Sequence, residues 1–207
     1  MKKILSLILS LAIIFFSGVK VYSLELPQSD TNVHFYMDWN MITNKSSHQW
    51  QLQHSGFIST DENGIRYAQD TNGEKYYLVA LAERYGTEIG SVYEVTLDNG
   101  SVFRVMLGDC KSNKDAPNGY GRQCYNFITQ QTAINVLEFI VEEEKLPEKV
   151  TQWGSLTAVD TFNGNLEEIE YLGRAWYPTD CFLRRLQQIL IECVIYIHYY
   201  KFVLLIT

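Results

Sequence analysis

Asp109 is the residue of this chain whose position best suits chemistry. It follows the apolar run 105–107 and Gly108. Glycine lets the backbone approach its surroundings closely, and functional side chains gather where a regular element gives way to a loop. An aspartate held in this way can meet a ligand in a groove. Gly-Asp is also common in simple turns, so a turn aspartate is the alternative.

Two cysteines lie close to this aspartate in the sequence. Cys110 and Cys124 flank the segment 111–123, and in an oxidising compartment they could form a disulfide. Closing such a loop would stabilise the fold by about 3 kcal/mol. The chain has four cysteines, which permit three pairings, so a Cys110–Cys124 bridge is a preference among them.

The sequence gives little support to metal or cofactor chemistry. It has no Cys-x-x-Cys motif, and its histidines show neither metal-ligand nor catalytic-triad spacing; they are His34, His48, His54 and His198. Oxidation in the same compartment makes Cys110 a poor nucleophile. We therefore expect no metal and no cofactor.

The N-terminus has the order of a secretory signal peptide. Lys2 and Lys3 precede the apolar run 4–16, and small or tolerated residues lead to a cut after Ser23. An uncleaved anchor is the alternative. We expect cleavage and a secreted or cell-surface protein, with roughly 180 residues left for one domain with a substantial core.

Composition narrows the class of partner. The net charge is −7, and no stripe of Lys and Arg is present to neutralise phosphates, so we expect no nucleic-acid partner. The chain has 14 tyrosines. In an exported protein such rings can stack on sugars, although most are expected in strands and the core.

Local patterns predict a mainly β domain. The segments 92–97 and 102–107 alternate between apolar and polar residues around Asn99-Gly100, which is the strongest short hairpin signal. Turn signals around 60–64 and 70–73 bracket a short segment at 65–68. Further strands are predicted at 76–82, 133–141, 153–159 and 166–172.

The C-terminal segment differs in composition from the domain. It is apolar from residue 186 onward but is interrupted by Glu192, His198 and Lys201. A membrane span needs about 20 apolar residues without such interruptions. A weak membrane anchor, an amphipathic helix and an end altered by a frameshift are all open, and we favour an appended helix. Membrane association through this segment is one expectation.

At this point a family resemblance can be stated. The segments YLVAL at 77–81 and YGTEIG at 85–90, then the hairpin, then LGD at 107–109, resemble a double-psi β-barrel. The nearest types are cell-wall proteins with the 3D domain and the rare-lipoprotein-A-like domains, which also resemble expansins. The resemblance covers about residues 76–172 and implies a six-stranded double-psi β-barrel with an extended N-terminal arm and an appended C-terminal hydrophobic helix. The expected divisions are a signal peptide at 1–23, the arm at 24–66, the barrel at 67–175 and the hydrophobic segment at 176–207.

The resemblance also implies a site. Such barrels bind or cleave peptidoglycan glycan strands, and an aspartate protonates the glycosidic oxygen in catalytic members. Asp109 matches that aspartate, and Glu138 falls where the pattern has a later one. The first aspartate of the pattern meets Ala82 here, with Glu83 beside it, which weakens the case for catalysis.

Three functions follow as hypotheses. The first is a lytic transglycosylase or related hydrolase with Asp109 as general acid and Glu138 beside it. The second is a non-catalytic wall-binding module with Tyr85, Tyr120 and Tyr125 as stacking residues. The third is an accessory protein of a phage or conjugative element. The distance between the two carboxylates across an open groove would separate the first from the others.

Overall fold

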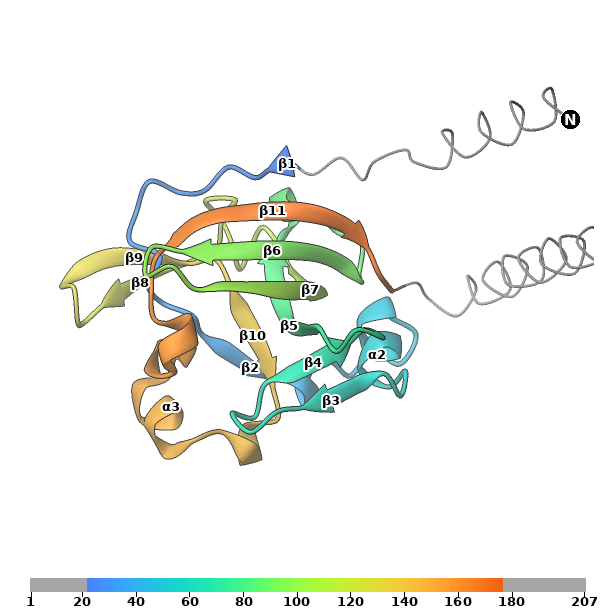
Figure 1. Cartoon of the computed structure of the whole chain (residues 1–207). Coiled ribbons are helices and arrows are strands. Elements are labelled where there is room, and N and C mark those ends of the chain that lie inside the picture. The colour runs from blue at the N-terminus through green and yellow to red at the C-terminus, as the bar shows by residue number, and fades with distance from the viewer. Residues whose placement is uncertain (1–21, 177–207) are drawn as a thin grey trace, which may run out of the picture.

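The chain folds around one large, curved β-sheet (Figure 1). The computed structural model describes residues 22–176. The strands are β1 (Tyr22–Ser23), β2 (Tyr36–Asp38), β3 (Ile58–Thr60), β4 (Arg66–Gln69), β5 (Lys75–Ala82), β6 (Ser91–Leu97), β7 (Val102–Lys111), β8 (Arg122–Asn126), β9 (Gln131–Asn135), β10 (Glu138–Val141) and β11 (Leu166–Arg174). The helices are α2 (His48–Gln53) and α3 (Glu148–Trp153), with 3-10 turns η1 (Trp39–Met41), η2 (Glu83–Tyr85), η3 (Glu143–Lys145), η4 (Leu156–Ala158) and η5 (Asp160–Phe162).

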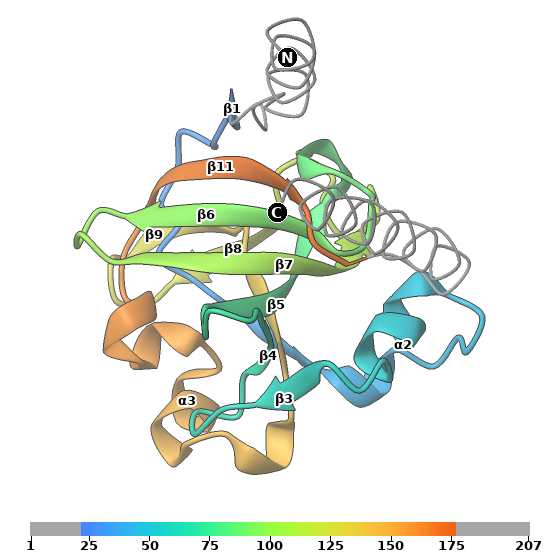
Figure 2. The ribbon, with the colours of Figure 1, turned by 45° about the vertical axis from the view of Figure 1, so that its right-hand side comes forward.

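The strand order places β5 at the centre of the site described below. The main path runs β1-β11-β6-β7-β5-β10-β2, with β4 also paired to β5 and β3 paired to β4. Strands β8 and β9 form a separate ribbon. Figures 1 and 2 show β11, β6 and β7 side by side, with β10 and β2 running at a steep angle to them.

Parallel pairing explains why β5 is so apolar. It runs parallel to β7, and its residues 78–82 are almost fully buried. Strands in parallel pairs are usually covered on both faces, so they lack polar alternation. Aromatic rings complete the core: Phe162 lies 5.0 Å from Phe103 and 4.7 Å from Phe139 between ring centroids.

The mainly β prediction is confirmed, but the described strands do not form a closed barrel. The six-stranded double-psi arrangement is therefore not established by these pairings. The predicted signal peptide, apart from residues 22–23 in β1, and the hydrophobic C-terminal segment, apart from residue 176, lie outside the described residues. Within the described part of the chain, no helix is long and apolar enough to cross a membrane.

The segment predicted as an N-terminal arm is integrated into the fold. It contributes β2, which pairs in parallel with β10, and α2, which lies against β7. His34 in the same segment is fully buried. The segment predicted as an arm therefore adds a strand to the sheet, and β4 spans the predicted boundary at residue 67.

Four predicted strands are confirmed, among them the one at 76–82 as β5, and two are wrong. The hairpin is confirmed as β6 and β7 around Gly100, whose φ is 84°, and the strand at 166–172 is confirmed as β11. The strand predicted at 133–141 is two strands, β9 and β10, because the chain changes partner from β8 to β5 at 136–137. The strand predicted at 153–159 is instead the end of α3 and the turn η4.

Candidate functional site

A β-bulge at Gly108 decides where Asp109 points. Leu107 pairs with Val79, whereas Asp109 pairs with Ala80, so Gly108 is an extra residue in β7. One extra residue reverses the alternation of side chains, which turns Asp109 to the face opposite that of Leu107. A Cβ on Gly108 would lie 2.6 Å from the Cδ1 atom of Ile140, so a larger residue here would have to displace the end of that side chain.

The bulge places the two predicted carboxylates in one row. Ala80 pairs with Asp109 on one side and with Glu138 of β10 on the other. Directly paired residues present their side chains to the same face, so Asp109, Ala80 and Glu138 share a face. One strand lies between the two acids, which separates their Cα atoms by about 9.5 Å. We expected Glu138 on the strand next to that of Asp109. In the structure, β5 lies between their two strands, β7 and β10.

A buried lysine connects β7 to Glu138. Lys111 pairs with Ala82, two residues along from Ala80 and therefore on the same face. Its Nζ atom lies 3.5 Å from the Oε2 atom of Glu138, and the Lys111 side chain is only 4% exposed. The small side chains of Ala80 and Ala82 leave the lysine room to cross β5. Burial lowers the pKa of Lys111, and the charge of Glu138 opposes that shift.

Lys111 is also bonded to the backbone. Its ammonium donates to the carbonyl oxygens of Asn135, at 3.1 Å, and Val136, at 3.4 Å. It therefore fixes the chain between β9 and β10 as well as Glu138. The sequence analysis missed this residue because it ended the strand at 107 and placed Lys111 in the segment between the two cysteines, whereas Lys111 is the last residue of β7.

Asp109 has a different environment. It is half-buried, and its Oδ1 atom accepts hydrogen bonds from the backbone N–H of Cys110 at 2.8 Å and from Nε2 of Gln49 at 3.3 Å. Burial raises the pKa of Asp109 above its ordinary value; these two bonds oppose the shift, and the charge of Glu138 adds to it. Asp109 thus keeps its proton to higher pH than a free aspartate does, which is what a general acid requires.

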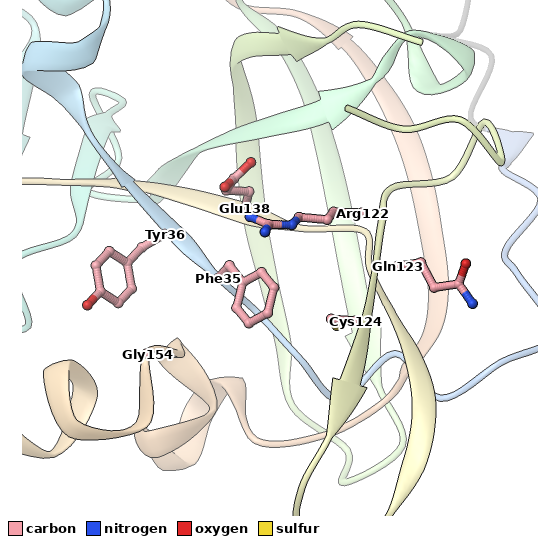
Figure 3. A pocket seen from close by; sticks show the side chains of 7 residues that line it. All are labelled: Phe35, Tyr36, Arg122, Gln123, Cys124, Glu138 and Gly154. Carbon is pink, nitrogen blue, oxygen red and sulfur yellow. The ribbon is translucent and has the colours of Figure 1, made fainter. Parts of the chain in front are cut away.

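An open cavity of about 370 Å³ lies at the Glu138 end of the row (Figure 3). Its lining comes from β8, from Gly154 and from the β2 region, where Phe35 and Tyr36 contribute aromatic rings that the sequence analysis did not select. Asp109 is not among the lining residues, so the cavity meets Glu138 and not the predicted acid. The lining residues are Phe35, Tyr36, Arg122, Gln123, Cys124, Glu138 and Gly154.

The three predicted stacking tyrosines have three different surroundings. Tyr85 is 4% exposed, and its hydroxyl donates to the carbonyl oxygen of Glu25. The Tyr120 hydroxyl donates to the Glu25 carboxylate at 2.9 Å, and the guanidinium of Arg84 lies 3.8 Å from its ring centroid. These two rings hold the N-terminal segment. Tyr125, at 52% exposure, presents its ring to solvent.

The predicted Cys110–Cys124 bridge is absent from the structure, in which both thiols are free. Cys110 pairs with Leu81 and so points to the face opposite Asp109, where its sulfur lies 3.8 Å from the carbonyl oxygen of Gly86. Cys124 lines the Glu138 cavity. The two sulfurs are therefore on opposite sides of the β5–β7 layer. Burial raises the pKa of Cys110 to about 11, which argues against a thiolate nucleophile.

Within residues 22–176, no group of three or more His, Cys, Asp or Glu side chains could hold a metal ion. His34 is buried, and that burial lowers its pKa to about 4, so its ring is neutral at physiological pH. Its Nε2 atom lies 3.1 Å from the carbonyl oxygen of Gly164, which makes it a core hydrogen-bonding residue.

The chain matches no protein-family model, and no curated protein or solved structure is significantly similar to it.

Proposed function

We propose that this chain is an exported protein that acts on cell-wall glycan, with Asp109 as the general acid and Glu138 as the second carboxylate. One observation carries the proposal: the Gly108 bulge aligns Asp109 with Ala80 and Glu138 on a single sheet face. Export and the wall as target rest on the residue patterns at the N-terminus and at 77–109.

The surroundings of the two acids suit different tasks. Asp109 is desolvated and has no ion pair among the described residues, which favours its protonated form. Glu138 is held by the Lys111 ammonium. Glycoside cleavage uses two carboxyl groups in unlike environments, one of which has a raised pKa and serves as the acid.

A second candidate function is glycan binding without cleavage. The observation that favours it is the cover over Asp109, where the Gln49 amide of α2 occupies one carboxylate oxygen. The open cavity lies instead at Glu138, beside Phe35 and Tyr36. Aromatic rings next to polar groups are well suited to sugars.

The proposal also includes the double-psi relation. Two parallel pairs, β5 with β7 and β10 with β2, are joined through the antiparallel pair of β10 and β5. Each parallel pair requires a crossover connection, and such a barrel is built from crossovers of this kind. Membrane association through the C-terminal segment, and a role in a phage or conjugative element, remain expectations from the sequence.

The test uses purified cell-wall sacculi and the full chain. If Asp109 is the acid, the wild-type protein releases soluble glycan fragments that mass spectrometry identifies, and Asp109→Asn lowers that rate by at least about 100-fold. Co-sedimentation with sacculi should be unchanged in the variant. Asp115→Asn, an exposed carboxylate nearby in the sequence, is the matched control.

The outcomes separate the two candidates. Wild-type protein that sediments with the wall but never releases fragments supports binding alone. A cleaving protein in which Asp109→Asn is fully active has another acid. Wild-type protein that neither binds nor cleaves wall glycan contradicts both candidates.

A further inference from the structure

The cavity at Glu138 lies against strand edges. Arg122, Gln123 and Cys124 are consecutive in β8, and all three line it. Consecutive strand residues point to opposite faces, so a cavity that touches all three borders the edge of the strand and not one of its faces. Phe35 and Tyr36, which are also consecutive, line the cavity as well, so it borders the edge of β2 too.

The backbone of β8 presents free hydrogen-bonding groups at that edge. The N–H of Ile134 in β9 donates to the carbonyl oxygen of Asp30, so the polar groups of Ile134 point away from β8. Gln123 is paired with Ile134. In an antiparallel ladder both members of such a pair point their N–H and C=O groups outward. The backbone N–H and C=O groups of Gln123 therefore point away from β9. No backbone hydrogen bond to either group occurs within residues 22–176.

The backbone of β2 is arranged in the same way. The carbonyl oxygen of Phe35 accepts from the N–H of Phe139 in β10. Tyr36 is the parallel partner of Phe139, so its own N–H and C=O point away from β10. Strand β2 ends the strand order of the described sheet, so that edge has no strand partner there.

The charges around the cavity favour an anion. Arg122 is exposed and makes no ion pair with any described residue. Figure 3 shows its side chain extending from β8 on the side of the cavity where Glu138 lies. Lys111 lies behind Glu138, so two cations accompany one carboxylate, and that carboxylate is already paired.

We propose that this cavity binds a short extended peptide that carries one carboxylate. The peptide backbone pairs with the outward N–H and C=O groups of Gln123, and its carboxylate meets the Arg122 guanidinium. Adding a strand to an open edge is an established mode of peptide recognition, and a guanidinium binds carboxylates through parallel hydrogen bonds. A volume of about 370 Å³ is within the range of small-ligand sites. This inference goes beyond glycan chemistry and does not depend on whether Asp109 cleaves anything.

The test follows backbone amide resonances of the full chain by NMR during titration with three probes. The first is N-acetyl-trialanine with a free C-terminal carboxylate, the second is its C-terminal amide, and the third is the free acid with a methylated central nitrogen. The free acid should shift the amides of Gln123 and Tyr36. The amide and the methylated peptide should each bind at least about tenfold more weakly.

Variants locate the charge. Arg122→Gln should remove the preference for the free acid over the amide, and Lys114→Gln, an exposed cation outside the cavity, should keep it. No shift with the free acid, equal binding of acid and amide, or shifts away from Gln123 and Tyr36 would each overturn the inference. A wall glycan that shifts these amides while the peptides do not would overturn it and leave the proposed function intact.

Discussion

The two ends of the carboxylate row differ in what surrounds each acid. Asp109 is covered by Gln49 and bonded to the N–H of Cys110. Glu138 opens onto a cavity and is paired with a buried lysine. The comparison teaches that one sheet face can hold two carboxylates in unlike states, one desolvated and one ion-paired, which is how acid and base roles are divided. The comparison also distinguishes the Glu138 end, where Lys111 stabilises the fold, from the Asp109 end, where burial of the carboxylate destabilises it.

The largest expected effect is at the Glu138 end. Lys111→Met keeps the apolar stem but removes the ammonium from Glu138 and from two backbone carbonyl oxygens. We expect a loss of about 3 kcal/mol in the free energy of unfolding, measured by urea denaturation. Lys114→Met, at an exposed position, should change it little. Equal stabilities for the two variants would mean that Lys111 does not hold this end.

The next effect tests the residue between the two acids. Ala80 is 1% exposed and lies between Asp109 and Glu138. Ala80→Leu overfills that space and should cost about 2 kcal/mol in unfolding free energy. Ala175→Leu, at an exposed site, is the matched substitution. A neutral Ala80→Leu would show that the row is not closely packed.

A smaller effect is expected from the other partner of the ion pair. Glu138→Gln leaves Lys111 with its two carbonyl acceptors, and the Glu138 side chain is 24% exposed, so solvent already screens part of the pair. The unfolding free energy should fall by about 1 kcal/mol, clearly less than for Lys111→Met. A larger loss than for Lys111→Met would reverse the assignment of the lysine as the structural partner.

The smallest effect, and the one with opposite sign, belongs to Asp109. Its raised pKa means that the folded state holds the proton more tightly than the unfolded chain, so its stabilising contribution is present at low pH and is lost as pH rises through the folded pKa. Because asparagine does not titrate, Asp109→Asn does not lose this stability as the pH rises. Relative to wild type, the variant should therefore gain stability as the pH rises through the folded pKa of Asp109, by up to about 1 kcal/mol. A relative gain on acidification instead would show a depressed pKa.

Local signals predicted part of this arrangement. Asn99-Gly100 between alternating segments gave the β6–β7 hairpin because turn and register are set by neighbouring residues. Asp109 was likewise selected from its neighbours in the sequence, the apolar run 105–107 and Gly108. The row itself depends on pairing between β5 and β10, more than 50 residues apart in the chain, and no local pattern encodes that register.

The failures have equally specific causes. The run 133–141 was predicted as one strand because its residues are apolar and buried both before and after the change of strand partner at 136–137. Composition alone does not mark that change. The segment 153–159 was predicted as a strand because of its aromatic and β-branched residues. Two helix signals were present: Pro147 precedes α3, and Gly154, with a φ of 64°, follows it. Lys111 was missed because the predicted strand ended at residue 107 and Lys111 was assigned to the segment between Cys110 and Cys124, whereas β7 extends to Lys111.

The central claim is that Asp109 and Glu138 lie on the same sheet face, on either side of Ala80. NMR titration of the Asp109 side-chain carboxyl carbon tests this claim most directly. We predict that the pKa of Asp109 lies above that of a free aspartate and falls in Glu138→Gln, because the negative charge across the row is removed. Glu142→Gln, just beyond the end of β10, should leave it unchanged. An Asp109 pKa at or below the ordinary value, or one that does not respond to Glu138→Gln, would contradict the shared face.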